Sequence, residues 1–242
     1  MSEDNYLEQG YHIDRYHALE EDLLRFLDFV TLEFYPNRAR QCIRSLYLAD
    51  LLLKIGSNID IFFYKYCIYL NDNFDNECQK FSVDSTQKGE SKKKLEKIIG
   101  MINSDKPITM NYFKGLESLL KLSNKYVTII SPEEILYPFN LGGEKDGLSW
   151  NNIKKDEVNF WWNSYNKVKH EGIFDRATLD NIICALAALL ILISLNKKLN
   201  LDKFEQYGYI HIPSLYDNSP RANRFKAAAD VKTKIFIKKT KA

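Results

Sequence analysis

The sequence predicts an all-α fold, or one that is mainly α, with four to five long helices and a few short peripheral strands. Three observations predict it. Apolar residues recur at helical spacing over long stretches, and the run from Ile182 to Leu195 is almost wholly apolar. The stretch from Trp161 to His170 combines aromatic and polar side chains on a helical period. Neither an internal repeat nor a glycine-rich phosphate loop occurs.

Length and composition are those of a globular protein. The chain has 242 residues, of which 45% are hydrophobic and 27% charged, enough to bury one core. We expect one domain over 1–242, with a polar insertion at about 71–95 and a basic C-terminal extension at about 213–242. The formal net charge is only +2, so any nucleic-acid binding must depend on a local basic patch.

Several classes of protein are disfavoured. The cysteines form no CxxC pair and have no histidine at ligand spacing, so we expect no metal, no disulfide framework and no cofactor. The apolar run Ile182–Leu195 is shorter than the ~20 residues that span a membrane, so we expect a buried core helix and no membrane partner. The N-terminus lacks a secretion signal, which favours the cytoplasm.

The first half of the chain predicts an antiparallel pair of helices. The first covers about 14–34, where Pro36 enforces an end, and the second covers about 39–70 with a possible kink at Gly56-Ser57. The polar composition of 71–90 predicts an exposed loop. A short helix is expected from Lys92 to about Ile102.

The second half predicts shorter elements and then two more helices. A helix is expected at 111–122, a strand at 126–130, and a loop at 133–152 that is rich in glycine. A final strand near Val231–Ile237 could pair with this strand or with 209–212.

The helices that follow are predicted at about 156–171, where Gly172 supplies the stop, and at about 176–199, buried among the others. In the first of them, polar and apolar residues form two neighbouring stripes. The polar stripe is Asn159, Asn163, Asn166 and His170, and the apolar stripe is Val158, Trp161, Tyr165 and Val168. One face can pack while the other presents amides and an imidazole.

The block Trp161-Trp162-Asn163-Ser164-Tyr165-Asn166-Lys167-Val168-Lys169-His170 resembles the signature helix of the HEPN superfamily. The resemblance extends more loosely to 135–139, to 185–195 and to 47–57. It implies a bundle of four or five helices that commonly dimerises. It also implies a metal-independent ribonuclease of toxin, phage-defence or RNA-processing systems, in which an arginine, a polar residue and a histidine, spaced Arg-polar-x-x-x-His, act on the RNA backbone.

Carried over to this chain, the resemblance makes Asn166 and His170 the candidate catalytic residues, and Tyr165 stands where the family has arginine. Cleavage of RNA without a metal needs a base, an acid and positive charge near the phosphate. A histidine can exchange protons near neutral pH, whereas a tyrosine cannot replace a permanent cation. The candidate phosphate-binding residues are Lys167, Lys169, Arg176, Arg40 and Arg44.

Each of these residues also has a structural interpretation. Tyr165, Trp161 and Trp162 are typical of packing residues, and Asn166 with His170 could form a hydrogen-bonded cluster between helices. We read His12 and His17 as surface residues.

Three hypotheses stay open for the function. The first is a HEPN-like protein that acts on or binds RNA, as a ribonuclease of phage defence or of a toxin system, with a second copy or a protein partner from the same system. The second is a catalytically silent module for dimerisation, RNA binding or regulation. The third is a sensor of a nucleotide or small anion.

Overall fold

The computed structural model describes residues 11–30, 37–80, 83–106, 108, 110–129, 134–157 and 159–195. This part of the chain is mostly helical, which confirms the predicted all-α class. The expected strands at 209–212 and 231–237 and the basic extension at 213–242 lie outside the described residues.

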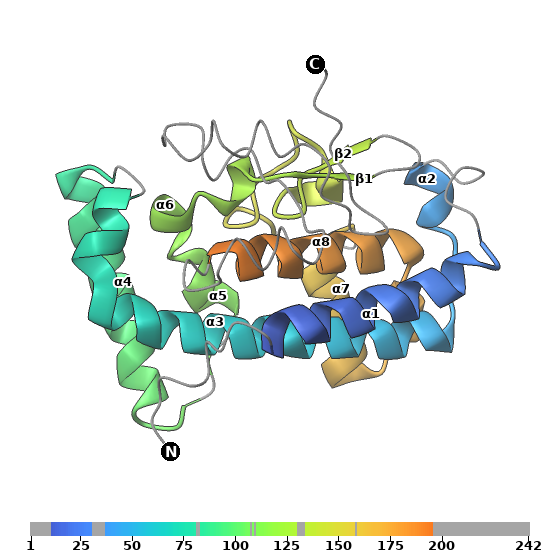
Figure 1. Cartoon of the computed structure of the whole chain (residues 1–242), viewed down its shortest axis with the longest axis horizontal. Helices are drawn as coiled ribbons and strands as arrows, with labels where there is room; N and C mark the ends of the chain where they lie inside the picture. Colours follow the sequence, from blue (N-terminus) through green and yellow to red (C-terminus); the bar gives the residue numbers. More distant parts are fainter. Residues whose placement is uncertain are drawn as a thin grey trace.

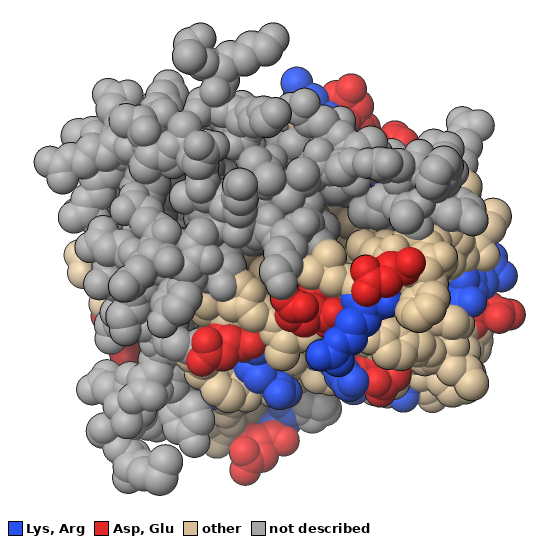
Figure 2. Space-filling model, turned by 45° about the vertical axis from the view of Figure 1, so that its right-hand side comes forward, with Lys and Arg blue, Asp and Glu red and all other residues tan. Residues whose placement is uncertain are grey.

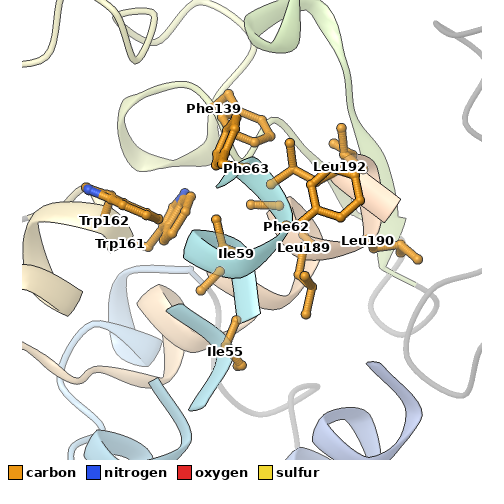
Figure 3. Close-up of a cluster of buried hydrophobic side chains, with 14 of the residues drawn as sticks. Ile55, Ile59, Phe62, Phe63, Phe139, Trp161, Trp162, Leu189, Leu190 and Leu192 are labelled. Carbon is orange, nitrogen blue, oxygen red and sulfur yellow. The ribbon is translucent and has the colours of Figure 1, made fainter. Parts of the chain in front are cut away.

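The long helices run beside one another around one apolar core (Figure 1). α1 (Tyr11–Leu27) and α3 (Leu46–Lys80) both pack against α8 (Leu179–Leu195). α7 (Trp161–Glu171) packs against α3 and α8, and α4 (Ser85–Ile102) packs against α3. Figure 3 shows Trp161 and Trp162 of α7 on one side of Ile59 of α3, and Leu189, Leu190 and Leu192 of α8 on the other side, all within this core.

α8 is the predicted buried helix. Every residue from Leu179 to Leu195 is buried except Ser194, as the apolar run predicted. The helix begins three residues later than expected, because Phe174–Arg176 form a separate turn of 3-10 helix. Burial on all sides explains why its apolar residues show no single-sided pattern.

The exposed loop predicted at 71–90 is wrong, because 71–80 belong to α3 and 85–90 belong to a further helix. α3 continues to Lys80, and α4 begins at Ser85 after Asp84, whose side chain accepts a hydrogen bond from the Gln87 amide at 2.8 Å. Buried Phe74 and Cys78 extend the stripe of Leu70 at intervals of one helical turn. The polar residues of the stretch cover the outer faces of a helical hairpin.

The helix boundaries in the first half also differ from those predicted. α1 spans Tyr11–Leu27, and the second predicted helix divides into α2 (Asn37–Arg40) and α3. The helix is continuous at Gly56-Ser57, and the backbone departs from helical angles at Asn73 instead (φ −122°). A glycine in the helix interior therefore did not mark a kink here.

The segment between α4 and α7 consists of short elements that cover one side of the core. They are α5 (Met110–Lys114), α6 (Glu117–Leu120), 3-10 turns at Leu122–Asn124 and Leu141–Gly143, β1 (Val127–Ile129) and β2 (Glu134–Leu136). β1 pairs antiparallel with β2, with Val127 opposite Leu136. β2 belongs to the stretch that we expected to be a loop.

A single carboxylate ties this segment together. Glu117 accepts hydrogen bonds from the indole of Trp150 at 2.5 Å, from the Leu122 and Ser123 amides at 3.0 Å each, and from the Ser123 hydroxyl. Trp150 is fully buried beside Phe63 and Phe139. The short elements are therefore fixed on α3 although they form little regular structure.

Candidate functional site

α7 is anchored to the core by its aromatic residues. Trp161 and Trp162 are 1% and 3% exposed, and the Trp161 indole donates to the Pro138 carbonyl at 2.6 Å. At the other end, Gly172 has the positive φ (66°) of a left-handed helix stop, as predicted. The helix begins at Trp161 rather than near 156, after a turn whose Lys154 and Glu157 carbonyls accept from the Asn163 amide.

Tyr165, at the position of the family's arginine, is fully buried. Its ring lies directly against Gly56, where a side chain would have no room. The hydroxyl donates to Asp60 of α3 at 2.7 Å, and Lys169 lies 3.2 Å from the same carboxylate and 5.1 Å from the centre of the ring. Tyr165 is thus a packing residue that joins α7 to α3, as its structural interpretation predicted.

This arrangement raises the pKa of both Tyr165 and Lys169. Burial raises the pKa of Tyr165, and the hydrogen bond to Asp60 adds to that effect. Burial disfavours the charged form of Lys169, but the hydrogen bond with Tyr165 and the charge of Asp60 outweigh it and raise the pKa of Lys169. Lys169 is therefore a firmly held cation whose charge is largely offset by Asp60.

The polar stripe of α7 forms one wall of an open cleft of about 490 Å³. Four residues predicted for the site line it together: Asn166, Lys167, Lys169 and His170. Asn163 of the same polar stripe also lines it. Other parts of the chain add Asp60, Ile108, Lys114, Ile153 and Lys155, and Trp162 and Glu171 complete the wall from α7.

Asn166 and His170 are available to a ligand. Asn166 is half-buried and His170 is exposed. Neither side chain hydrogen-bonds to another residue in the described ranges. The hydrogen-bonded cluster that we considered as their structural interpretation is therefore not formed between these residues.

The charges of the cleft are unevenly balanced. Lys167 forms an ion pair with Glu171 at 2.8 Å, and Lys169 forms one with Asp60. Lys114 donates to the Ile153 carbonyl at 2.9 Å, and neither it nor Lys155 forms an ion pair within the described part of the chain. Burial lowers the pKa of Lys114, because its ammonium is partly removed from water without a counter-ion. The cleft therefore has excess positive charge.

None of the three arginines predicted to bind phosphate lines this cleft. Arg176 does line a smaller hollow of about 100 Å³ that shares Lys155, Asn163 and Lys167 with the cleft. Arg40 is fully buried, and its Nε lies 3.6 Å from Asp180 of α8, so in this structure it cannot meet a phosphate from solvent. Arg44 and Arg176 line a second hollow of about 210 Å³ together with Asn159 and Asp175. That hollow combines both signs of charge at the start of α8 and does not include His170.

One prediction about the remaining histidines is wrong. His12 is 3% exposed and its ring packs edge-on against Phe62, with 5.6 Å between ring centres. It lies on the inner face of α1, which begins before the residues we assigned to that helix. His17 is partly exposed, and its Nδ1 lies 3.6 Å from Glu20.

Sequence reasoning missed Asp60, Lys114 and Lys155 as residues of the cleft. Asp60 follows a local signal, since it is a charged residue within an otherwise apolar part of α3. Lys114 and Lys155 carry no such signal, because their place depends on how the segments around α5 and before α7 fold back on α7. The turn that contains Lys155 is fixed by hydrogen bonds from the Asn163 side chain to the Lys154 and Glu157 carbonyls.

Metal ligands and membrane helices were also sought in the described ranges. No three His, Cys, Asp or Glu residues there lie close enough together to hold a metal ion. All four cysteines are free thiols, with Cys42 exposed and Cys67, Cys78 and Cys184 buried. No helix in these ranges is long and apolar enough to cross a membrane.

Comparison with known proteins gave no match to a protein-family model, to a curated protein or to a solved structure.

Proposed function

We propose that the chain is a HEPN-like protein that binds RNA in the cleft along α7 and cleaves it without a metal ion, in a phage-defence or toxin system. One observation supports this proposal above the others. Asn166, His170 and four lysines line the same solvent-open cleft, and the amide and imidazole make no bond to another described residue. A structural polar cluster would instead use up their donors and acceptors.

The proposed chemistry assigns one role to each group. His170 takes the proton from the ribose 2′-hydroxyl or returns one to the leaving oxygen. Asn166 donates a hydrogen bond to a phosphoryl oxygen on which charge builds up. Lys114 and Lys155, which lack a carboxylate partner among the described residues, supply the positive charge that Tyr165 cannot.

The surface favours binding that is confined to the cleft. On the face shown in Figure 2, Lys and Arg side chains lie next to Asp and Glu side chains instead of forming one basic patch. A formal net charge of +2 gives no strong overall attraction to RNA. We therefore expect the affinity for RNA to depend only weakly on salt, as for about two phosphate contacts. The logarithm of the binding constant should then fall with the logarithm of the salt concentration with a slope of about −1.4 for single strands.

The test is cleavage of labelled transfer RNA and total RNA in the presence of EDTA. We expect the wild type to cut and His170→Ala to lose ~10²-fold or more in rate, with Asn166→Ala also strongly impaired. Asn76→Ala is a matched control, because Asn76 is an exposed amide on α3 that does not line the cleft. Equal cutting by all four proteins, or none by any of them, would contradict the proposal.

A second candidate is a catalytically silent module that binds RNA or regulates a partner. It is favoured by the burial of Tyr165, because no guanidinium stands at the family's arginine position. In that case RNA remains intact but is retained in a filter-binding assay. Lys155→Gln weakens this binding, and Lys93→Gln, on the exposed face of α4, leaves it unchanged.

We also infer a homodimer, as the resemblance implies. Ile173 and Phe174, which follow α7, are apolar side chains that are 37% and 48% exposed. We take these two adjacent exposed side chains as the place where a second copy packs. Sedimentation of the wild type and of Ile173→Asp tests this, and a wild type that sediments as a monomer at 100 μM would refute it.

A further inference from the structure

One indole hydrogen has no acceptor among the described residues. Of the three tryptophans, Trp150 donates to Glu117 at 2.5 Å and Trp161 donates to the Pro138 carbonyl at 2.6 Å. The Nε1 atom of Trp162 is buried and has no hydrogen-bond partner within the described ranges. Its ring nitrogen lies at the end turned away from Trp161 and the aromatic core (Figure 3), and the residue lines the cleft.

An unused indole hydrogen at this place indicates what kind of atom would pair with it. Buried polar groups in proteins are nearly always hydrogen-bonded, and a donor left unsatisfied is costly. The indole N–H can only donate, so its missing partner must be an acceptor. Nε1 has almost no solvent access in this conformation, so an acceptor reaches it only when the side chains around it move.

Lys114 adds a second set of unused donors to the same cleft. Its ammonium carries three hydrogens, of which one is given to the Ile153 carbonyl. The side chain is positioned by α5, whose Phe113 stacks on Phe63 of α3 with 4.5 Å between ring centres. Burial without a counter-ion lowers the pKa of Lys114, and a bound anion would remove that penalty.

We propose that Trp162 Nε1 and Lys114 Nζ form an anion subsite that binds a phosphate group of a nucleotide. Lys155, the other cleft lysine without an ion pair to a described residue, supplies a second positive charge, which suits phosphate better than a carboxylate. Ile108 and Ile153 provide an apolar wall. The volume of about 490 Å³ exceeds what a bare ion needs and leaves room for the rest of a nucleotide.

In the proposed nuclease, this subsite holds the phosphate group on which Asn166 and His170 act, because Lys114 and Lys155 are the cations assigned to that phosphate above. The assignment of RNA as the source of the phosphate rests on the function proposed above, whereas the subsite itself does not. A free nucleotide offers the same oxygen atoms. Because Nε1 is covered, binding must be accompanied by a shift of the flexible side chains around it.

The test uses the indole ¹⁵N–¹H signals, one for each of the three tryptophans. Trp162→Phe assigns the Trp162 signal. The probes are AMP, inorganic phosphate and a 2′-O-methyl oligoribonucleotide that cannot be cleaved, with sodium chloride as the salt-matched control. We expect the phosphate probes to shift the Trp162 signal, while the Trp150 and Trp161 signals stay in place. A Trp162 signal that stays unmoved at 10 mM of every probe would overturn the proposal.

Variants then test the partner group. Lys114→Gln is expected to weaken binding by at least tenfold while all three signals remain dispersed, and Lys93→Gln is expected to bind like the wild type. Equal affinity of Lys114→Gln and wild type would remove Lys114 from the subsite and overturn the proposal. If Lys114→Gln does not fold, which collapsed signals would reveal, the wild-type titration alone decides.

The probes also separate the two possible sources of phosphate. Tighter binding of the oligoribonucleotide than of AMP assigns the subsite to an RNA strand, and the reverse order assigns it to a free nucleotide. A shift without RNA cleavage would reject the proposed nuclease and keep the subsite, and cleavage without a shift would do the opposite.

Discussion

Replacing Gly56 by alanine tests the contact that fixes α7 on α3. A methyl group at this position would lie 2.6 Å from Cγ of the Tyr165 ring and closer still to Cδ2 and Cε2. Unstrained carbon atoms approach to about 3.5 Å, so the overlap is about 1 Å. The ring cannot easily move aside, because it is fully buried and its hydroxyl is bonded to Asp60.

Two effects of opposite sign decide how much Gly56→Ala changes the unfolding free energy. Alanine is better than glycine in a helix interior by about 1 kcal/mol, and overpacking of a filled core costs about 1–3 kcal/mol. With the ring held at both ends we place the cost near the upper value and expect Gly56→Ala to lose about 2 kcal/mol of unfolding free energy. The melting temperature should then fall by about 4–8 °C.

The assay is urea unfolding followed by circular dichroism. Gly89→Ala is the matched control, because Gly89 lies within α4 and an added methyl meets nothing within 4 Å. This variant should gain up to about 1 kcal/mol. In a Tyr165→Ala background, Gly56→Ala should no longer destabilise. A Gly56→Ala protein as stable as the wild type would refute the role of this contact.

Two further substitutions test buried polar groups. The Tyr66 hydroxyl is buried with no hydrogen-bond partner in the described part of the chain, so Tyr66→Phe should stabilise by about 1 kcal/mol. Burial, followed by the charge of Glu77, raises the pKa of Tyr66 well above its ordinary value, which is about 10 in the unfolded chain. Below pH ~10 the hydroxyl is neutral in both states, and above it the unfolded chain ionises first, so the unfolding free energy falls as the pH rises. Urea unfolding at pH ~7 and ~11 should therefore show a smaller alkaline loss for Tyr66→Phe. A variant that is less stable than the wild type at neutral pH would show that the hydroxyl is paired. Glu117→Gln places an NH₂ donor among the donors of Trp150, Leu122 and Ser123, so it should lower the unfolding free energy by about 1–3 kcal/mol. The indole ¹⁵N–¹H signal of Trp150 should also move. An unchanged signal would count against Glu117 as the anchor of this segment.

Local signals in the sequence predicted the central elements of the fold. The apolar run at 182–195 could only be buried, and α8 lies there. The aromatic residues of α7 and the glycine after it predicted a packed helix with a defined end at Gly172. These features depend on neighbouring residues alone, which is why the sequence was sufficient for them.

The polar stretch after Leu70 shows how composition can mislead. Its asparagines, aspartates and lysines favoured a loop, but only their outer faces are polar. Phe74 and Cys78 continue the buried stripe of α3, and Leu95, Ile98 and Ile102 form that of α4. Spacing of the few apolar residues, rather than the polar average, carried the helical signal.

The candidate site was predictable only as far as one helix extends. Asn166, Lys167, Lys169 and His170 share α7, so their spacing placed them together in the cleft. Lys169 meets Asp60 across 109 positions of sequence, and Lys114 meets Ile153 across 39. No local pattern specifies such contacts. Arg40 failed as a phosphate ligand because it pairs with Asp180 inside the core.

The burial of α8 also affects how the chain can be made. α1 and α3 leave the ribosome long before residues 179–195, yet both pack on that helix. Until α8 emerges, the parts of their apolar faces that pack on it have no cover, so the core closes as a late step through contacts that are distant in sequence. Polar substitutions within α8 should therefore reduce the yield of soluble chain during synthesis as well as the stability of the purified protein.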